Sequence, residues 1–122
     1  MIQKTLMTAA IAAALIVASS MQNKPASADG DMASYKAALP LLEEAGGGKT
    51  CTECFIEKYA PAVFTKAFAV SKDGAYGGRW KKNISMDEAR EGALASCRKK
   101  PTYNPANPCV VFFENDKLVW KP

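Results

Sequence analysis

Four cysteines are the residues most able to do chemistry in this sequence, and their spacing divides them into two pairs. Cys51 and Cys54 form a CxxC motif, whereas Cys97 and Cys109 lie farther along the chain. A CxxC pair can act as a redox site, in which a helix start favours the thiolate of the first cysteine, here Cys51, and this thiolate attacks a partner disulfide. We favour a local structural disulfide instead, since thioredoxin-like chemistry is expected in a βαβ context that this stretch lacks.

Other cysteine chemistries are disfavoured by the residues around them. The chain contains no histidine, which excludes Cys2His2 zinc sites and Cys–His nucleophilic catalysis, and Phe55 stands where a c-type haem motif needs histidine. A four-cysteine zinc site would require a compact second knuckle, which the spacing of Cys97 and Cys109 does not resemble. We therefore expect no metal, no cofactor and no catalytic residue.

Two basic segments with interspersed aromatic residues could bind an anionic polymer. The first contains Arg79, Trp80, Lys81 and Lys82, and the second contains Arg98, Lys99, Lys100 and Tyr103. A charged helix end and a solvated turn explain the same residues, and we favour that interpretation because small proteins need charged surface for solubility.

The first residues have the three-part pattern of a secretory signal peptide. Lys4 precedes an apolar run from Leu6 to Ala18, and small residues at Ala26 and Ala28 suit a signal peptidase. The run is shorter than the roughly 20 residues that span a bilayer. We predict cleavage after Ala28, a periplasmic or secreted location and no stable membrane span in the mature protein.

Removal of residues 1–28 from the 122-residue chain leaves 94 residues, and Lys4 and Lys24 are lost with the leader. The sixteen basic residues become fourteen against twelve acidic ones, a net charge of +2. So small a charge does not predict a nucleic-acid partner. A domain of this size is marginally stable, and the exported compartment is oxidising, so we expect the four cysteines to form two intrachain disulfides.

Before the sheet, the pattern predicts a helical segment over residues 29–62 that carries the CxxC motif. Apolar residues recur at helical spacing from Asp29 to Gly48, where Pro40 should kink the helix, and a second short helix is predicted from Cys51 to Tyr59.

Residues 63–122 are predicted to form a disulfide-stabilised α+β domain. Two strands are expected on either side of the Lys72–Gly74 turn, although Lys66 interrupts the apolar alternation of the first. Ser85 and Glu88 form a capping box, which predicts a helix from Met86 to Arg98. The run from Cys109 to Phe113 is apolar on both faces, as in a central strand, and Leu118–Trp120 should close a hairpin.

The predicted fold is therefore α+β: a small antiparallel sheet in ββαββ order with one capped helix packed on it. Cys97 would end this helix on its inward face, and Cys109 would begin the strand beneath it. This arrangement favours a Cys97–Cys109 disulfide, although four cysteines allow three connectivities.

Residues 64–120 resemble a bacterial family of small exported domains of unknown function. The resemblance lies in the segments Ala67–Ser71, Asp73–Gly77, Asp87–Ala89, Ala93–Cys97 and Cys109–Val111. It implies the sheet-and-helix arrangement and the Cys97–Cys109 pairing, but no catalytic residue.

We expect a non-enzymatic binding or accessory module of the cell envelope, acting on an unknown envelope protein or polymer. The alternatives are a periplasmic thiol–disulfide protein that uses Cys51 and Cys54, and a secreted interaction or toxin-like protein.

Overall fold

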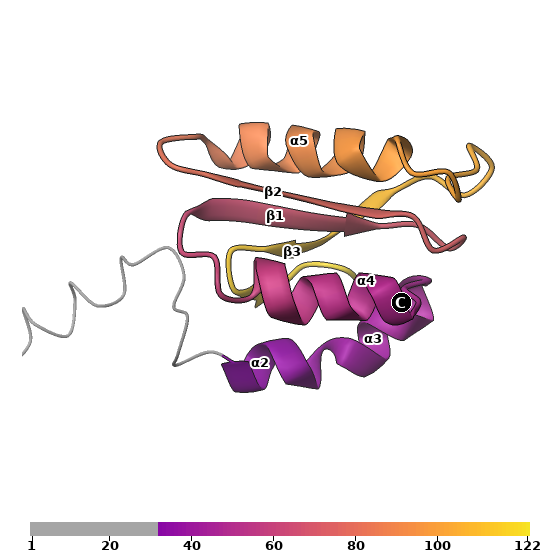
Figure 1. Cartoon of the computed structure of the whole chain (residues 1–122), viewed down its shortest axis with the longest axis horizontal. Coiled ribbons are helices and arrows are strands. Elements are labelled where there is room, and N and C mark those ends of the chain that lie inside the picture. The colour runs from indigo at the N-terminus through magenta and orange to yellow at the C-terminus, as the bar shows by residue number, and fades with distance from the viewer. Residues whose placement is uncertain (1–31) are drawn as a thin grey trace, which may run out of the picture.

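The computed structural model describes residues 32–122, so the predicted signal peptide lies outside the described residues. A four-stranded antiparallel sheet forms the middle layer. One helix covers one face of the sheet, and the N-terminal helical segments cover the other (Figure 1). The elements are α2 (Met32–Ala37), α3 (Leu39–Ala45), α4 (Lys49–Cys54), the π-helix η1 (Phe55–Tyr59), β1 (Thr65–Val70), β2 (Tyr76–Lys81), α5 (Met86–Arg98), β3 (Val110–Glu114) and β4 (Lys117–Leu118). The predicted α+β class is confirmed.

The strands follow the predicted ββαββ order along the chain, and they lie in the sheet in the order β2-β1-β3-β4. β1 is therefore an inner strand that pairs with both β2 and β3. β3 is the other inner strand, but Val110 at its start is 40% exposed, so β1 is the more fully buried of the two. β4 has only two residues, which leaves the first half of β3 without a neighbouring strand on that side.

Alternate residues of β1 supply two separate cores. Phe68 and Val70 face the N-terminal helices and join a cluster of aromatic side chains from both segments of the chain. Ala67 and Ala69 face α5, where small side chains allow the helix to lie close to the sheet. The helices before residue 63 therefore complete one core of the sheet.

A register shift in β3 increases the number of aromatic rings in the larger core. Phe68 pairs with Phe113 and Ala69 pairs with Val111, so Phe112 is the extra residue of a β-bulge. The bulge places both Phe112 and Phe113 against Phe55, with ring centroids 5.7 and 5.0 Å away.

The N-terminal helices break where the sequence predicts. Pro40 lacks an amide hydrogen, and its ring would collide with the preceding turn of a continuous helix. The helix is therefore interrupted at Ala38, and a new helix, α3, begins at Leu39. Gly46 then ends α3 at a φ of 122°, and its amide donates to Glu43 while that of Gly47 donates to Leu42. The predicted second helix is present as α4, which continues directly into η1.

The capping box that starts α5 is also confirmed. The Ser85 hydroxyl accepts from the Glu88 amide, and the Glu88 carboxylate accepts from the Ser85 amide. The helix ends at Arg98, so Cys97 lies in its last turn, fully buried against the sheet.

Candidate functional site

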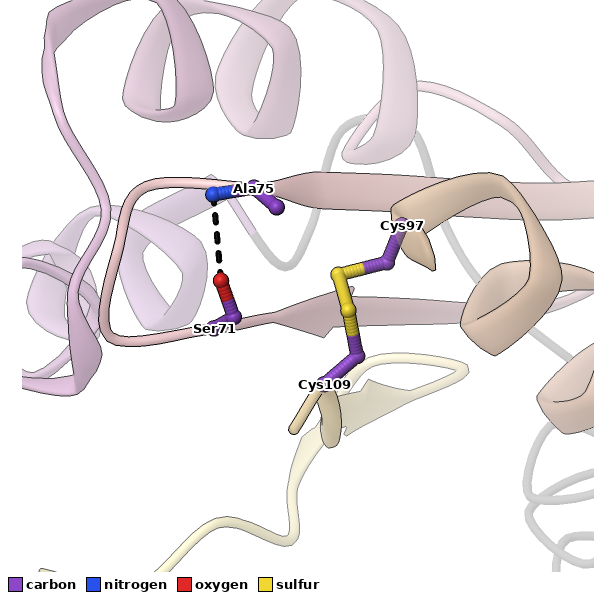
Figure 2. The surroundings of a disulfide bond; sticks show 4 residues. All are labelled: Ser71, Ala75, Cys97 and Cys109. Carbon is purple, nitrogen blue, oxygen red and sulfur yellow. Dashed lines mark hydrogen bonds between the residues drawn. A yellow bond between two sulfur atoms is a disulfide. The ribbon is translucent and has the colours of Figure 1, made fainter. Parts of the chain in front are cut away.

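A disulfide joins Cys97 to Cys109, one of the three connectivities that the sequence allows. Figure 2 shows the bond linking the end of α5 to the segment that enters β3, near the turn between β1 and β2. In that turn the Ser71 hydroxyl accepts a hydrogen bond from the Ala75 amide. Cys97 and Ala75 belong to the same buried cluster, so the bond reinforces the α5 side of the sheet.

The CxxC pair lies on the other side of the sheet, in α4. Cys51 is 1% exposed and belongs to the aromatic core, whereas Cys54 is only partly buried. Both are free thiols in this structure, so a second disulfide between them stays a prediction. Residues three apart on an ideal α-helix have Cα atoms about 5 Å apart, a separation that a disulfide can bridge.

Cys54 opens into a hollow of about 310 Å³, which we call the Cys54 hollow. The helical segment supplies most of its wall, β2 supplies Tyr76, and the loop after α5 supplies Lys100. The Lys100 ammonium lies 4.5 Å from the centroid of the Tyr76 ring. The lining residues are Thr50, Glu53, Cys54, Glu57, Lys58, Tyr76 and Lys100.

Burial sets the protonation state of both thiols. Desolvation, followed by the nearby charge of Cys54, raises the pKa of Cys51 to about 12. Desolvation also raises the pKa of Cys54, although the ammonium groups of Lys58 and Lys100 act in the opposite direction. A rapid redox catalyst depends on a lowered thiol pKa. The environment of this pair therefore does not favour fast catalytic thiol exchange.

The structure does not bring the two basic segments together as one patch. Arg79 and Lys81 lie on the α5 face of β2, in a hollow that also contains Glu88 and Glu91. Trp80 lies on the opposite face of the strand, where its ring centroid is 6.1 Å from that of the Tyr59 ring. Acidic residues therefore alternate with the basic ones, and the aromatic ring faces away from them.

The residues of the second basic segment also lie in different surroundings. Arg98 and Lys99 are exposed at the end of α5, whereas Lys100 folds toward the Cys54 hollow. Tyr103 packs against the alanine-rich cluster beneath α5. Binding of an anionic polymer across both segments stays a prediction, and this arrangement does not support it.

Lys66, which interrupts the apolar alternation of β1, is a fully buried cation. Its ammonium group donates to the carbonyl oxygens of Tyr59 at 2.7 Å, Ala60 at 3.0 Å and Ala62 at 2.7 Å. These carbonyls lie at the last residue of η1 and just beyond it, where a helix end carries partial negative charge. The Tyr59 carbonyl also accepts from the Ala62 amide at 3.1 Å. A charged residue at an inward strand position was the available signal for this contact.

A second hollow, which we call the Trp120 hollow, lies beside the uncovered half of β3. Its volume is about 290 Å³, and its lining is mostly apolar. The amides of Val119 and Trp120 donate to the Phe112 carbonyl, which holds the indole over this region. The lining residues are Ala45, Val70, Ser71, Lys72, Ala106, Asn107, Pro108, Val110 and Trp120. The sequence patterns alone did not indicate this site.

Residues 32–122 contain neither a metal-binding cluster nor a membrane-spanning helix. In this part of the chain, no cluster of three or more histidine, cysteine or acidic side chains could hold a metal ion. The same residues include no helix with the length and apolar character needed to cross a membrane.

No family model, curated protein or solved structure matches this chain. The resemblance to a family of exported domains therefore stays a prediction.

Proposed function

We propose that this chain is an exported, non-enzymatic binding module of the cell envelope, and that it binds a protein partner at the Trp120 hollow. The hollow supports this proposal because it combines apolar walls with a few polar groups, the usual composition of a binding site. Its Val110 side chain is 40% exposed, although the residue lies on an inner strand.

The size of the hollow favours a side chain of a protein over a large ligand. Sites for drug-sized molecules usually span about 300 to 1,000 Å³. At about 290 Å³, the Trp120 hollow lies at the lower limit of this range and has room for an aliphatic or aromatic side chain of a partner. An anionic polymer is the less supported partner, because Glu88 and Glu91 accompany Arg79 and Lys81 on the other face of the sheet.

The walls of the hollow are well anchored, as a preformed binding site requires. The Asn107 side chain donates to the Asp73 carboxylate at 2.9 Å, which ties the proline-rich loop to the β1–β2 turn. The Cys97–Cys109 disulfide holds the other end of the same loop. Gly46 lies so close to Ser71 that an added Cβ would be 2.1 Å from the Ser71 carbonyl oxygen, so α3 also packs tightly here.

Site-specific photocrosslinking in the exporting cell would test this proposal. A benzophenone amino acid at position 110 should crosslink to one discrete envelope protein. The same group at position 63 is a matched control, because Val63 is similarly exposed, at 45%, and does not line the hollow. Equal crosslinking from both positions, or none from position 110, would contradict binding at the hollow. A crosslink only to proteins of a neighbouring or host cell would favour the interaction or toxin-like alternative.

A further inference from the structure

The CxxC pair carries an inference that does not depend on the Trp120 hollow. We propose that Cys54 and Cys51 form a two-step thiol site for a disulfide ligand, in which Cys54 attacks first and Cys51 completes the reaction. This order is the reverse of the sequence expectation, in which the first cysteine of the motif is the nucleophile.

Access decides which thiol meets the ligand. Cys51 is 1% exposed within the aromatic core, so the sulfur of an external disulfide does not reach it in the folded protein. Cys54 lines the hollow of about 310 Å³, where there is room for the two sulfur atoms of a small disulfide. Thiol–disulfide exchange depends on such access to the attacking sulfur.

The charges around the hollow favour the same order. Lys58 and Lys100 stabilise a thiolate at Cys54, while Glu57 and the loss of water oppose it. At Cys51, desolvation and the neighbouring Cys54 both oppose the thiolate, and Lys100 alone favours it. Glu53 and Tyr76 complete the wall of the hollow. Two lysines and two glutamates line the hollow, so its charge is balanced and access to the Cys54 sulfur decides the order.

The two steps balance in atoms and electrons. Cys54 loses its proton to solvent, and its sulfur attacks one sulfur of the disulfide, whose S–S bond breaks to release a first thiolate. Cys51 then loses its proton, and its sulfur attacks the Cys54 sulfur and displaces the second thiolate. The two cysteines lose two electrons and become a disulfide, while the ligand gains two electrons and becomes two thiols.

The helix allows the second step. The Cα atoms of residues three apart in α4 are about 5 Å apart by ideal helix geometry, within the range for a disulfide. The thiol of Cys54 is also near enough to raise the pKa of Cys51. Cys51 can therefore reach the mixed disulfide from inside the core without entering the hollow.

The test uses protein with an intact Cys97–Cys109 disulfide and a reduced CxxC pair, mixed with glutathione disulfide and followed by intact mass. Cys51→Ser should accumulate one glutathione adduct at Cys54. Cys54→Ser should react at least about tenfold more slowly, because access limits exchange. The wild type should end as a Cys51–Cys54 disulfide without a lasting adduct.

Peptide mapping of the first adduct in wild-type protein gives an independent readout if the Cys51→Ser variant does not fold. Mapping to Cys54 supports the proposed order, and mapping to Cys51 overturns it. A stable wild-type adduct that never gives an internal disulfide would overturn the resolving role of Cys51. Urea-unfolded protein is the control, because both cysteines should then react at similar rates.

Discussion

The ammonium group of Lys66 donates a hydrogen bond of 2.7 Å to the carbonyl oxygen of Tyr59 and lies 4.4 Å from the centroid of the same residue's ring. One cation thus connects the inner strand β1 to the end of the helix that carries the CxxC motif. The Tyr59 hydroxyl in turn donates to the Asn115 carbonyl at 2.7 Å, which extends the connection to the β3–β4 turn. This buried polar contact positions the helices over the sheet.

Replacement of Lys66 by methionine should destabilise the fold. The variant keeps much of the side-chain volume but removes the donor from the carbonyls of Ala60 and Ala62, and a buried acceptor left without a partner costs about 1 to 3 kcal/mol. We expect the free energy of unfolding, measured by urea denaturation, to fall by at least about 2 kcal/mol. Lys117→Met at an exposed position is the control and should change little. A similar small effect at both positions would show that the Lys66 contacts contribute little.

Loss of the Cys97–Cys109 disulfide should have a comparable effect. Replacement of both Cys97 and Cys109 by alanine removes the cross-link that restricts the unfolded chain. Removal of a native disulfide from a small domain typically lowers the free energy of unfolding by about 2 to 5 kcal/mol. Urea denaturation measures this loss, and wild-type protein in strong reductant should approach the stability of the variant. Unchanged stability in the paired variant would contradict a stabilising role for this bond.

Gly77→Ala should push α5 away from β2. A Cβ at this position would lie 2.4 Å from the Cys97 amide nitrogen and 2.7 Å from the Ala93 carbonyl oxygen. Such overpacking typically costs about 1 to 3 kcal/mol. Gly48→Ala is the matched control, because no heavy atom lies within 4 Å of its added Cβ. The prediction is contradicted if the thermal midpoints of the two variants agree.

The reactivity of Cys54 should depend steeply on pH. Because burial raises its pKa, the thiolate fraction at pH 7 is lower than in the unfolded chain and continues to grow above pH 9. In the Cys51→Ala variant, the rate of iodoacetamide alkylation should rise about tenfold per pH unit from pH 7 to 9. In urea the rate should level off near the ordinary cysteine pKa of about 8.5. A plateau below pH 8 in the folded protein would show a lowered pKa and a faster redox site.

Local patterns in the sequence determined several parts of this protein. Ser85 and Glu88 specify where α5 begins, because a capping box involves residues only three apart. The spacing of the apolar residues in α5 places Cys97 inward, and Pro40 breaks the first helix through its own ring. Each of these features depends on neighbours in the chain, so each can be read without a fold.

The tertiary structure alone decided the surroundings of the reactive and charged residues. The burial of Cys51, the partial exposure of Cys54 and the approach of Lys100 depend on how α4, Tyr76 of β2 and the loop after α5 come together around one hollow. The larger, aromatic core also required the bulge at Phe112, which no alternation of residue types indicates. The partners of Lys66 are backbone carbonyls four to seven residues earlier in the chain. Which carbonyl oxygens reach the ammonium group depends on how the chain turns between η1 and β1, and the type of side chain carries no information about that turn.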